Sequence, residues 1–398
     1  MKIFFVHNSY RSSAPSGEDI VAGNERKLLE DNGMEVIAYE KYNDDIDDST
    51  IRNKVRLAVN TVWSRKNYEE ALKLLQKVKP DLAHVHSLHP QISPSIYSAC
   101  HRAGVPVVHT LHNYRYICPG ALLLREGKPC EDCVGRLPVN ALRYRCYRGS
   151  LAATGALFAM IGFNRFRGTF TGEVNRYISL TEFAKSRMVA GGFPEEMIEV
   201  KPNFLSPVQI HSGVKERHAV YVGRLTAEKG VRTLIAAWKF VNDFPLKVVG
   251  DGALREELEI YVRENALNVE FVGTQTRERV LEMVGSSFMQ IVPSECYEGF
   301  PMAVLEAYAC GTPVLASRIG SLSEVVQNGV TGLFFEAGNP GDLARMVNEL
   351  GSNPELASRL GNRARELFIE KYTPEQNFQM LMGIYQRARE DFENRRKG

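Results

Sequence analysis

The chain has 398 residues, of which 44% are hydrophobic and 24% charged, and its formal net charge at pH 7 is +2. This length is enough for two ordinary domains that each bury a core, and the composition excludes a disordered or fibrous chain. A charge this close to neutral gives no general attraction to nucleic acid, so nucleic acid is not an expected partner.

The first residues, MKIFFVHNSY, contain too short an apolar run, followed too soon by polar residues, to form a signal peptide. No uncharged run approaches the roughly 20 residues that a membrane-spanning helix needs. The expected location is therefore the cytoplasm, either free or peripheral at the inner face of the membrane. Seven cysteines cannot all pair, and cytoplasmic thiols more often serve as core residues or metal ligands.

Short apolar runs rich in β-formers alternate with longer helical patterns, which is typical of parallel sheets covered by helices. In the first half, strands are expected at residues 2–8, 35–40, 81–87, 106–112 and 176–180. In the second half they are expected at residues 219–225, 246–252, 269–274, 287–293, 313–317 and 332–336. Helices fill most of the gaps, and the last segment, 373–398, is long and amphipathic.

The two halves meet where Pro202, Pro207 and Gly213 interrupt the periodicity. We therefore predict a first Rossmann-like domain over 1–206, a second over 207–375 and a C-terminal helix over 376–398. Open parallel sheets bind ligands at the carboxyl ends of their strands, so the loops after strands are where chemistry is expected.

The loop YVGRLTAEKG carries two cations next to glycines. Arg224 can form a forked pair with phosphate oxygens, while Lys229 is a mobile point charge. Two solvated surface cations are the alternative interpretation. In VVGDG, Gly250 and Gly252 could admit a phosphate, although a simple turn explains them better.

The stretch SECYEGFPMAVLEAYACGTPVLAS, residues 294–317, places Glu306 in a helix that is apolar on every side. A buried carboxylate is costly unless it is paired. Glu306 is therefore either in a structural ion pair, at an edge that faces water, or an acceptor for ligand hydroxyls, as in dinucleotide folds. Glu298 lies just before the helix, next to backbone amides that attract anions and polar ligand atoms.

On GRLTAEKG and EGFPMAVLEAYACGTPVLAS, the chain resembles the retaining glycosyltransferases of GT-B architecture, most closely glycosyltransferase family four (glycosyl transferases group 1). The second stretch matches the family's E-x7-E motif, and NGVTGLFFEAGNPGDLA is similar to the segment that follows it. The resemblance covers nearly the whole chain. It implies an α/β fold of two Rossmann-like parallel-sheet domains facing a central cleft, with the C-terminal helix crossing back to the first domain.

The resemblance also implies roles for individual residues. Arg224 and Lys229 would hold the diphosphate of a nucleotide-sugar donor, Glu306 the ribose hydroxyls and Glu298 the hydroxyls of the donor sugar, while the backbone near Val272 would read the base. His112 would lie beside the donor sugar and join Arg224, Lys229 and Glu298 in the catalytic set. The remaining donor-binding residues implied are Gly17, Gly223, Gly250, Gly299, Phe300, Met302 and Ala303.

The implied reaction moves a hexosyl group from a UDP- or GDP-sugar to an acceptor hydroxyl on a glycan or lipid-linked molecule. The anomeric configuration is retained and no metal is needed for transfer. A nucleotide-sugar epimerase would instead convert the donor without an acceptor, and a non-catalytic nucleotide-sugar binding protein would release no sugar. Presence of Arg224, Lys229, Glu298 and Glu306 together favours activity over mere binding.

Three further histidines lie at His84, His86 and His109. All three are expected to be buried packing or hydrogen-bonding residues, because they fall within apolar strands. Metal binding by His84 and His86 together with His89 is a minor alternative.

The insertion at about 115–150 contains Cys118, Cys130, Cys133 and Cys146, with a C-x2-C pair at its centre. Four thiolates would suit a structural zinc ion, and disulfides or four reduced thiols are the alternatives. The same region is basic, with an apolar run LAATGALFAMIGF, and could contact an anionic membrane; a solvated basic face over a core helix is the alternative. Its cations are Arg136, Arg143, Arg145, Arg148, Arg165 and Arg167.

Overall fold

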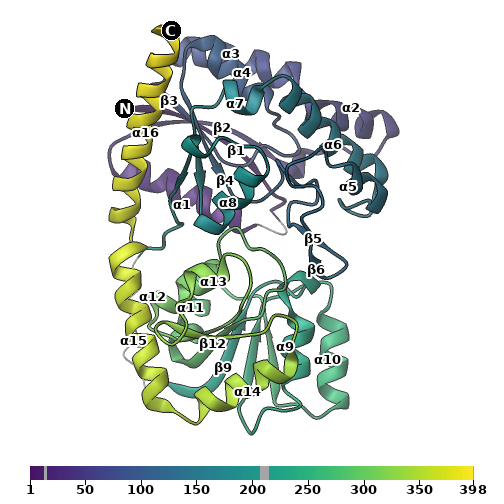
Figure 1. Cartoon of the computed structure of the whole chain (residues 1–398), viewed down its shortest axis with the longest axis vertical. Helices are drawn as coiled ribbons and strands as arrows, with labels where there is room; N and C mark the ends of the chain where they lie inside the picture. Colours follow the sequence, from purple (N-terminus) through teal and green to yellow (C-terminus); the bar gives the residue numbers. More distant parts are fainter. Residues whose placement is uncertain (13–15, 207–214, 398) are drawn as a thin grey trace. The chain divides into compact units, whose positions relative to one another are not determined.

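The computed structural model describes residues 1–12, 16–206 and 215–397. The chain divides into two compact units, coloured along the sequence in Figure 1. The first unit consists of Met1–Leu123, Cys130–Asn203 and Asn377–Gly398, and the second of Leu124–Pro129 and Phe204–Gln376. The boundary predicted at residue 207 lies outside the described residues.

The first unit is built on a six-stranded parallel sheet of order β2-β1-β3-β4-β7-β8. All five strands predicted in this half are confirmed. The sixth, β8, escaped prediction because it has only three residues, one of them the charged Glu199. The strands are β1 (Lys2–Ser9), β2 (Glu35–Tyr42), β3 (Leu82–Val85), β4 (Val107–Leu111), β7 (Arg176–Ser179) and β8 (Ile198–Val200).

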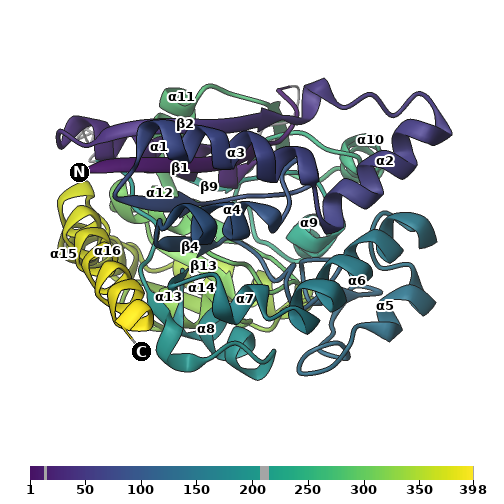
Figure 2. The same ribbon diagram turned by 90° about the horizontal axis from the view of Figure 1, so that it is seen from above.

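Helices cover this sheet, and Figure 2 shows them from above. From Asn377 on, the long helix α16 belongs to this unit, and its Leu381, Ile384 and Tyr385 share a buried cluster with Ile3 and Phe5 of β1. The helices are α1 (Gly17–Asp31), α2 (Ile51–Val62), α3 (Arg65–Val78), α4 (Ser95–Ala103), α5 (Val139–Tyr144), α6 (Leu151–Phe166), α7 (Thr169–Gly172), α8 (Glu182–Ala190) and α16 (Pro374–Lys397).

The second unit contains another six-stranded parallel sheet, of order β11-β10-β9-β12-β13-β14. All six strands predicted here are confirmed, so the predicted α/β class with two parallel sheets is correct. The strands are β9 (Glu216–Val222), β10 (Leu246–Val249), β11 (Val269–Gly273), β12 (Ser287–Val292), β13 (Val314–Ser317) and β14 (Gly332–Phe335).

One buried apolar cluster joins this second sheet to its helices, with Tyr221, Ile291 and Leu343 among its members. The helices are α9 (Val231–Ala237), α10 (Arg255–Glu264), α11 (Arg277–Ser286), α12 (Met302–Ala309), α13 (Leu322–Val325), α14 (Pro340–Gly351) and α15 (Pro354–Lys371). A short antiparallel hairpin, β5 (Leu124–Arg125) and β6 (Lys128–Pro129), lies within the cysteine insertion and escaped prediction because each strand has two residues. No helix in the described part of the chain combines the length and apolar character needed to cross a bilayer.

Candidate functional site

Each sheet has a point where its strand order reverses, and open parallel sheets bind ligands at such points. In the second sheet the order reverses between β9 and β12. The loop after β9 carries Arg224 and Lys229, and the loop after β12 carries Glu298. The topology of the second unit therefore brings together three of the residues predicted to bind the donor.

Gly230 allows these two loops to touch. Its backbone is left-handed, with φ at 67°, and a Cβ at this position would lie 1.8 Å from the carbonyl oxygen of Pro293. Glycine alone adopts this backbone conformation without strain and has no Cβ to clash with the carbonyl oxygen. The loop after β9 can therefore press against the end of β12 and hold Lys229 next to Glu298.

Lys229 and Glu298 form a close ion pair. The Lys229 Nζ lies 2.6 Å from Oε1 and 2.9 Å from Oε2 of Glu298, and the hydroxyl of Ser294 donates to the same carboxylate at 2.6 Å. Burial alone would raise the pKa of Glu298, but the lysine outweighs it and the pKa is lowered. Burial alone would lower the pKa of Lys229, but Glu298 raises it. Both groups are therefore charged at neutral pH.

Arg224 lies near this pair but is mostly solvated. Its side chain is 68% exposed and makes a 3.4 Å contact with Glu228, while its backbone carbonyl accepts a hydrogen bond from Tyr221 at 2.8 Å. The hydroxyl of Tyr221 thus fixes the backbone of the loop and leaves the guanidinium able to reorient. Such an arginine can turn toward an incoming phosphate at little cost.

Glu306 lies on α12, which starts after Pro301 and ends before the left-handed Gly311. Burial raises the pKa of Glu306 to about 7, with a small opposing effect of Arg277. Among the residues that the structure describes, none hydrogen-bonds to this carboxylate or forms an ion pair with it. The alternative of a structural ion pair thus has no support here, and a ligand hydroxyl is a chemically suitable partner.

The other residues predicted in this unit lie around the same strand ends. Gly223 and Gly250 contact each other so closely that a Cβ on Gly250 would lie 2.0 Å from the Gly223 carbonyl oxygen. The carbonyl of Val272, at the end of β11, accepts a 3.2 Å hydrogen bond from the Gln275 side chain. The loop before α12 and its first turn hold Gly299, Phe300, Met302 and Ala303.

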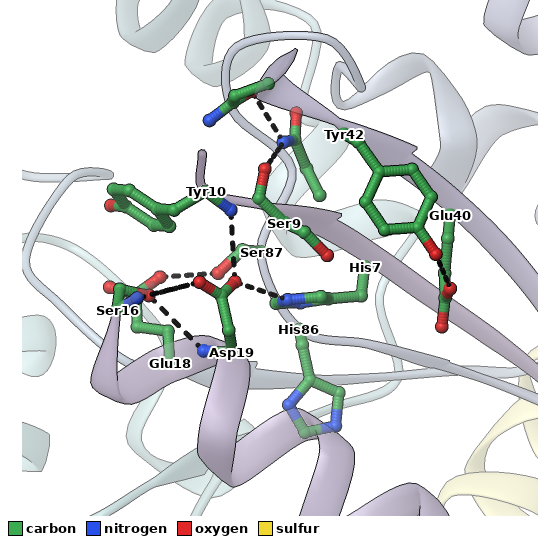
Figure 3. Close-up of polar contacts among 12 residues, drawn as sticks. His7, Ser9, Tyr10, Ser16, Glu18, Asp19, Glu40, Tyr42, His86 and Ser87 are labelled. Carbon is green, nitrogen blue, oxygen red and sulfur yellow. Dashed lines mark hydrogen bonds and ion pairs between the residues drawn. The ribbon is translucent and has the colours of Figure 1, made fainter. Parts of the chain in front are cut away.

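In the first sheet the strand order reverses between β1 and β3. Helix α1 begins there with Gly17, after Ser16 and Asp19 form reciprocal capping hydrogen bonds. Asp19 also accepts from the backbone amide of Tyr10 at 3.1 Å and pairs with the His7 ring at 2.9 Å, as Figure 3 shows. Gly17 thus lies at the start of a well-anchored helix.

Glu18 is the residue at this end that sequence reasoning missed. Its carboxylate accepts from the Ser87 hydroxyl at 2.5 Å (Figure 3) and from the Asn113 side chain at 2.6 Å. It lines a small pocket with Tyr10 and His112, and its charge is the main reason that the pKa of Tyr10 is raised to about 12. The Ser16-x-x-Asp19 capping pattern could have drawn attention to this turn.

His112 follows β4 and lines the same pocket. Its Nε2 lies 2.9 Å from Nδ1 of His86, and Nε2 of His86 faces the Glu25 carboxylate at 3.5 Å. Burial raises the pKa of Glu25, but Lys201, His84 and His86 outweigh this effect and hold it well below its usual range. Because an ionised carboxylate only accepts, it favours a proton on the facing nitrogen of His86, and the other nitrogen then accepts from His112.

The pKa values of His86 and His112 are both lowered to about 3, first by burial, so both rings are neutral at pH 7. The predicted burial of His84, His86 and His109 is confirmed, since each is at most 1% exposed. His109 bonds to the Tyr97 hydroxyl at 2.6 Å and to the His86 carbonyl at 2.9 Å, in keeping with the packing role expected of it.

Glu25, His84 and His86 also have their ligand atoms within 4.8 Å of one another, close enough to share a metal ion. However, the Lys201 Nζ is already 2.8 Å from Glu25, and Asn377 holds it at 2.9 Å from the other side. This buried ammonium supplies the positive charge that a metal would bring. The cluster is therefore better explained as a structural ion pair.

The cysteine insertion holds the four thiols predicted to bind zinc. Burial raises the pKa of the Cys133 thiol to about 11, with contributions from Cys118, Cys146 and Cys130, so all four thiols gather in one region. Burial also raises the pKa of the Cys118 thiol, and nearby backbone amides, first that of Leu123, oppose this. Yet within the described part of the chain no three of these thiols lie within 4.8 Å of one another. Zinc binding stays a prediction.

Two family profiles match the chain. The profile of Glycosyltransferase Family 4 matches residues 26–208, and that of Glycosyl transferases group 1 matches residues 206–367. The chain belongs to glycosyltransferase family four. The resemblance inferred from the two sequence stretches is thereby confirmed.

Curated relatives match less than half of this chain. An uncharacterized glycosyltransferase of Methanocaldococcus jannaschii is 36% identical over 168 residues, which are 42% of this chain and 47% of that protein. The N-acetyl-alpha-D-glucosaminyl L-malate synthase of Bacillus anthracis is 30% identical over 187 residues, 45% of this chain and 48% of its own. The chain thus spans about half the length of the curated relatives it matches.

Solved structures match this chain over nearly its full length. HepE of Anabaena in complex with UDP superposes with a TM-score of 0.67 at 16% identity, covering 96% of this chain and 99% of HepE. Sucrose-phosphate synthase of Thermosynechococcus elongatus gives 0.69 at 20% identity, with 97% and 98% covered. Structural matches at such low sequence identity establish the fold alone. They confirm the GT-B class predicted for the two Rossmann-like sheets.

Proposed function

We propose that this protein is a retaining, metal-independent hexosyltransferase that uses a nucleoside diphosphate sugar. The observation that carries the proposal is the Lys229–Glu298 pair at the reversal of the second sheet, with Arg224 beside it. Glu306 on α12 adds a carboxylate that has no partner among the described residues. Cations for a diphosphate and carboxylates for hydroxyls are what such a donor requires.

Binding of the donor would replace the contact between Lys229 and Glu298 with contacts from each residue to the donor. A diphosphate oxygen would take the place of Glu298 on Lys229, and the freed carboxylate would accept hydrogen bonds from the sugar. Arg224 would turn to the same diphosphate. Glu306 would accept from the ribose hydroxyls, and the first-turn amides of α12 would point toward the donor.

In the proposed reaction, the bond between the anomeric carbon and the diphosphate oxygen breaks and a bond to the acceptor oxygen forms on the same face. The electron pair leaves with the diphosphate, whose growing charge Arg224 and Lys229 stabilise. The acceptor hydroxyl proton passes to an oxygen of the leaving diphosphate. His112, neutral and held by His86, would contact the donor sugar.

Relatives support this donor class without identifying its members. HepE was solved with UDP and with UDP plus glucose. The synthase of Bacillus anthracis is named for an N-acetylglucosaminyl product. We propose a UDP- or GDP-sugar as donor and a glycan or lipid-linked hydroxyl as acceptor.

The test is a thermal-shift screen of the purified protein against UDP-, GDP- and ADP-sugars, followed by product analysis by mass spectrometry and NMR. We expect one donor to raise the melting temperature, and glycoside with the donor's anomeric configuration to form in the presence of EDTA. Conversion of the donor without an acceptor would instead identify an epimerase. Binding without release of nucleoside diphosphate across a broad acceptor panel would identify a binding protein.

A further inference from the structure

The exposed large apolar side chains are unevenly distributed over the surface of this protein. Of the eighteen that the structure shows exposed, nine lie in just two segments of the first unit, 51–62 and 136–168. Phe166 is 92% exposed and Ile51 is 83% exposed. The others are Val55, Val59, Leu137, Val139, Tyr144, Leu151 and Phe163. Scattered single apolar residues are normal on a surface, but such a concentration indicates an interaction site.

The two segments lie side by side in the fold. Helix α6 packs against both α2 and α5, and both views place the three helices together at one end of the first unit (Figures 1 and 2). On α2, the exposed Ile51, Val55 and Val59 are spaced four residues apart and so follow one stripe of the helix. We call the segments 51–62 and 136–168, which contain α2, α5 and α6, the α2–α6 face.

The charge of this face has one sign. Segments 51–62 and 136–168 contain nine Lys and Arg residues and no Asp or Glu. Arg165 is structural, because its guanidinium donates to the carbonyls of Tyr116, Arg136 and Gly191. The other eight are exposed and form no ion pair with any described residue: Arg52, Lys54, Arg56, Arg136, Arg143, Arg145, Arg148 and Arg167. Acidic residues precede both segments: Asp47 and Asp48 lie before α2, and Glu131 and Asp132 lie before Arg136.

Several of these cations are held over aromatic rings. The guanidinium of Arg167 lies 4.7 Å from the centre of the Trp63 ring, that of Arg148 lies 5.2 Å from Tyr147, and that of Arg143 lies 5.5 Å from Tyr144. Aromatic rings and basic side chains both favour the boundary between water and lipid headgroups. Aliphatic side chains such as Ile51 and Val59 gain nothing from nucleic acid, which binds through phosphate contacts and base stacking.

We infer that the α2–α6 face binds the surface of an anionic lipid bilayer. The aliphatic and phenylalanine side chains enter the acyl boundary, and the eight exposed cations meet the anionic headgroups. The sequence indicated only the basic and apolar segment around α6, whereas the structure adds the stripe and cations of α2. This inference does not depend on the proposed reaction, because the α2–α6 face contains none of the residues assigned to the donor.

The experiment is co-sedimentation of the whole protein with vesicles of phosphatidylcholine alone and of phosphatidylcholine mixed with phosphatidylglycerol. We expect partition onto the mixed vesicles only, and a steep loss of binding as salt is added. Exchange of Arg52, Arg56 and Arg143 for glutamine should weaken binding about a hundredfold, since each cation near such a surface contributes about fivefold. Phe166→Ser should weaken it about tenfold.

Matched controls lie on the second unit. Phe240 is 59% exposed and Arg359 is exposed, so Phe240→Ser and Arg359→Gln remove the same chemistry elsewhere and should leave vesicle binding unchanged. All substitutions are at exposed positions, and unchanged melting temperatures confirm folding. Equal binding to neutral vesicles, no binding, or loss that Phe240→Ser reproduces would overturn the inference. So would a Phe166-dependent dimer in sedimentation velocity, or preferential binding of a single-stranded oligonucleotide.

Discussion

Each unit holds a lysine–glutamate ion pair, and the two pairs differ in their exposure to solvent. In the first unit, Lys201 and Glu25 are each 1% exposed, and their ion pair is enclosed by neutral histidines and Asn377. In the second unit, the side chains of Lys229 and Glu298 are 24% and 12% exposed, and the solvated Arg224 stands beside them. The two sheets have similar topology, yet one lysine–glutamate pair is fully buried and the other is partly open to solvent. Under the proposed function, a ligand replaces a partner only in the second pair.

The strongest test of this contrast is Lys229→Met, which removes the partly exposed lysine. Because Lys229 would stabilise the leaving diphosphate, we expect kcat/KM for transfer to fall about 10²- to 10³-fold. Arg232→Met is the matched control, since Arg232 lies only three residues on and pairs with Glu257 at the surface. Equal losses in the two variants would contradict the assignment of Lys229 to the donor.

Lys201→Met should act on stability instead. It leaves the buried Glu25 without its ammonium, and breaking a buried pair in this way costs about 3–5 kcal/mol. Urea unfolding measures this loss, and the double variant Lys201→Met/Glu25→Leu should be less destabilised than the single one. If Lys201→Met lowered the free energy of unfolding no more than Lys229→Met does, Lys201 and Glu25 would not form a structural ion pair.

Glu306 makes a pH-dependent test of the donor site possible, because burial raises its pKa to about 7. Its carboxylate accepts ribose hydroxyls best when ionised, so donor affinity should fall about tenfold as pH is lowered from about 8 to about 6. For stability the sign is opposite: the raised pKa means that the folded state is favoured at acid pH and loses this advantage as pH rises through 7. Calorimetric titration with the donor measures the affinity.

Glu306→Gln provides the control, since an amide does not titrate in this range. Its donor affinity should be weaker than that of the native protein at pH 8 and nearly constant between pH 6 and pH 8. A slope that persists in Glu306→Gln would assign the pH dependence to another group.

The smallest expected effect concerns the positioning of His112. His86→Gln keeps a side chain that can hydrogen-bond but removes the ring between Glu25 and His112, so we expect kcat to fall several-fold, at most about tenfold, with KM nearly unchanged. The His112 pKa near 3 also predicts that His112 itself does not titrate between pH 5 and pH 8 in the kcat profile. His109→Gln, at a neighbouring buried ring, controls for packing. A KM effect alone would exclude this positioning role.

The sequence predicted the sheets well because their strands are continuous apolar runs, and it drew attention to Glu306 because a carboxylate stands out in an apolar helix. Glu25 escaped notice for the opposite reason. It lies in GNERKLLED, a charged stretch typical of a solvated helix, and its partner Lys201 is 176 residues away. Contacts between residues so distant along the chain leave no local pattern.

The ion pair between Lys229 and Glu298 could not be predicted from the sequence either. The family resemblance assigns Lys229 and Glu298 to different parts of one donor, and nothing in their spacing shows that they bond to each other. The contact depends on Gly230, whose missing side chain lets one loop rest on Pro293. Glu18 was missed because its partners Ser87 and Asn113 come from two other strand ends, and only the sheet order unites them.

The bond between Lys229 and Glu298 has a consequence for donor selection. In the unliganded protein, Glu298 occupies the position on Lys229 that a ligand phosphate would take, and Lys229 occupies the position on Glu298 that a ligand hydroxyl would take. Because both residues belong to one chain, dilution of the protein does not weaken this competition. A phosphate ion or a nucleoside monophosphate would displace Glu298 from Lys229 but would offer that carboxylate no sugar hydroxyl. Under the proposed function, a nucleotide sugar would carry both replacements on one molecule, so the pair would favour the intact donor over its fragments.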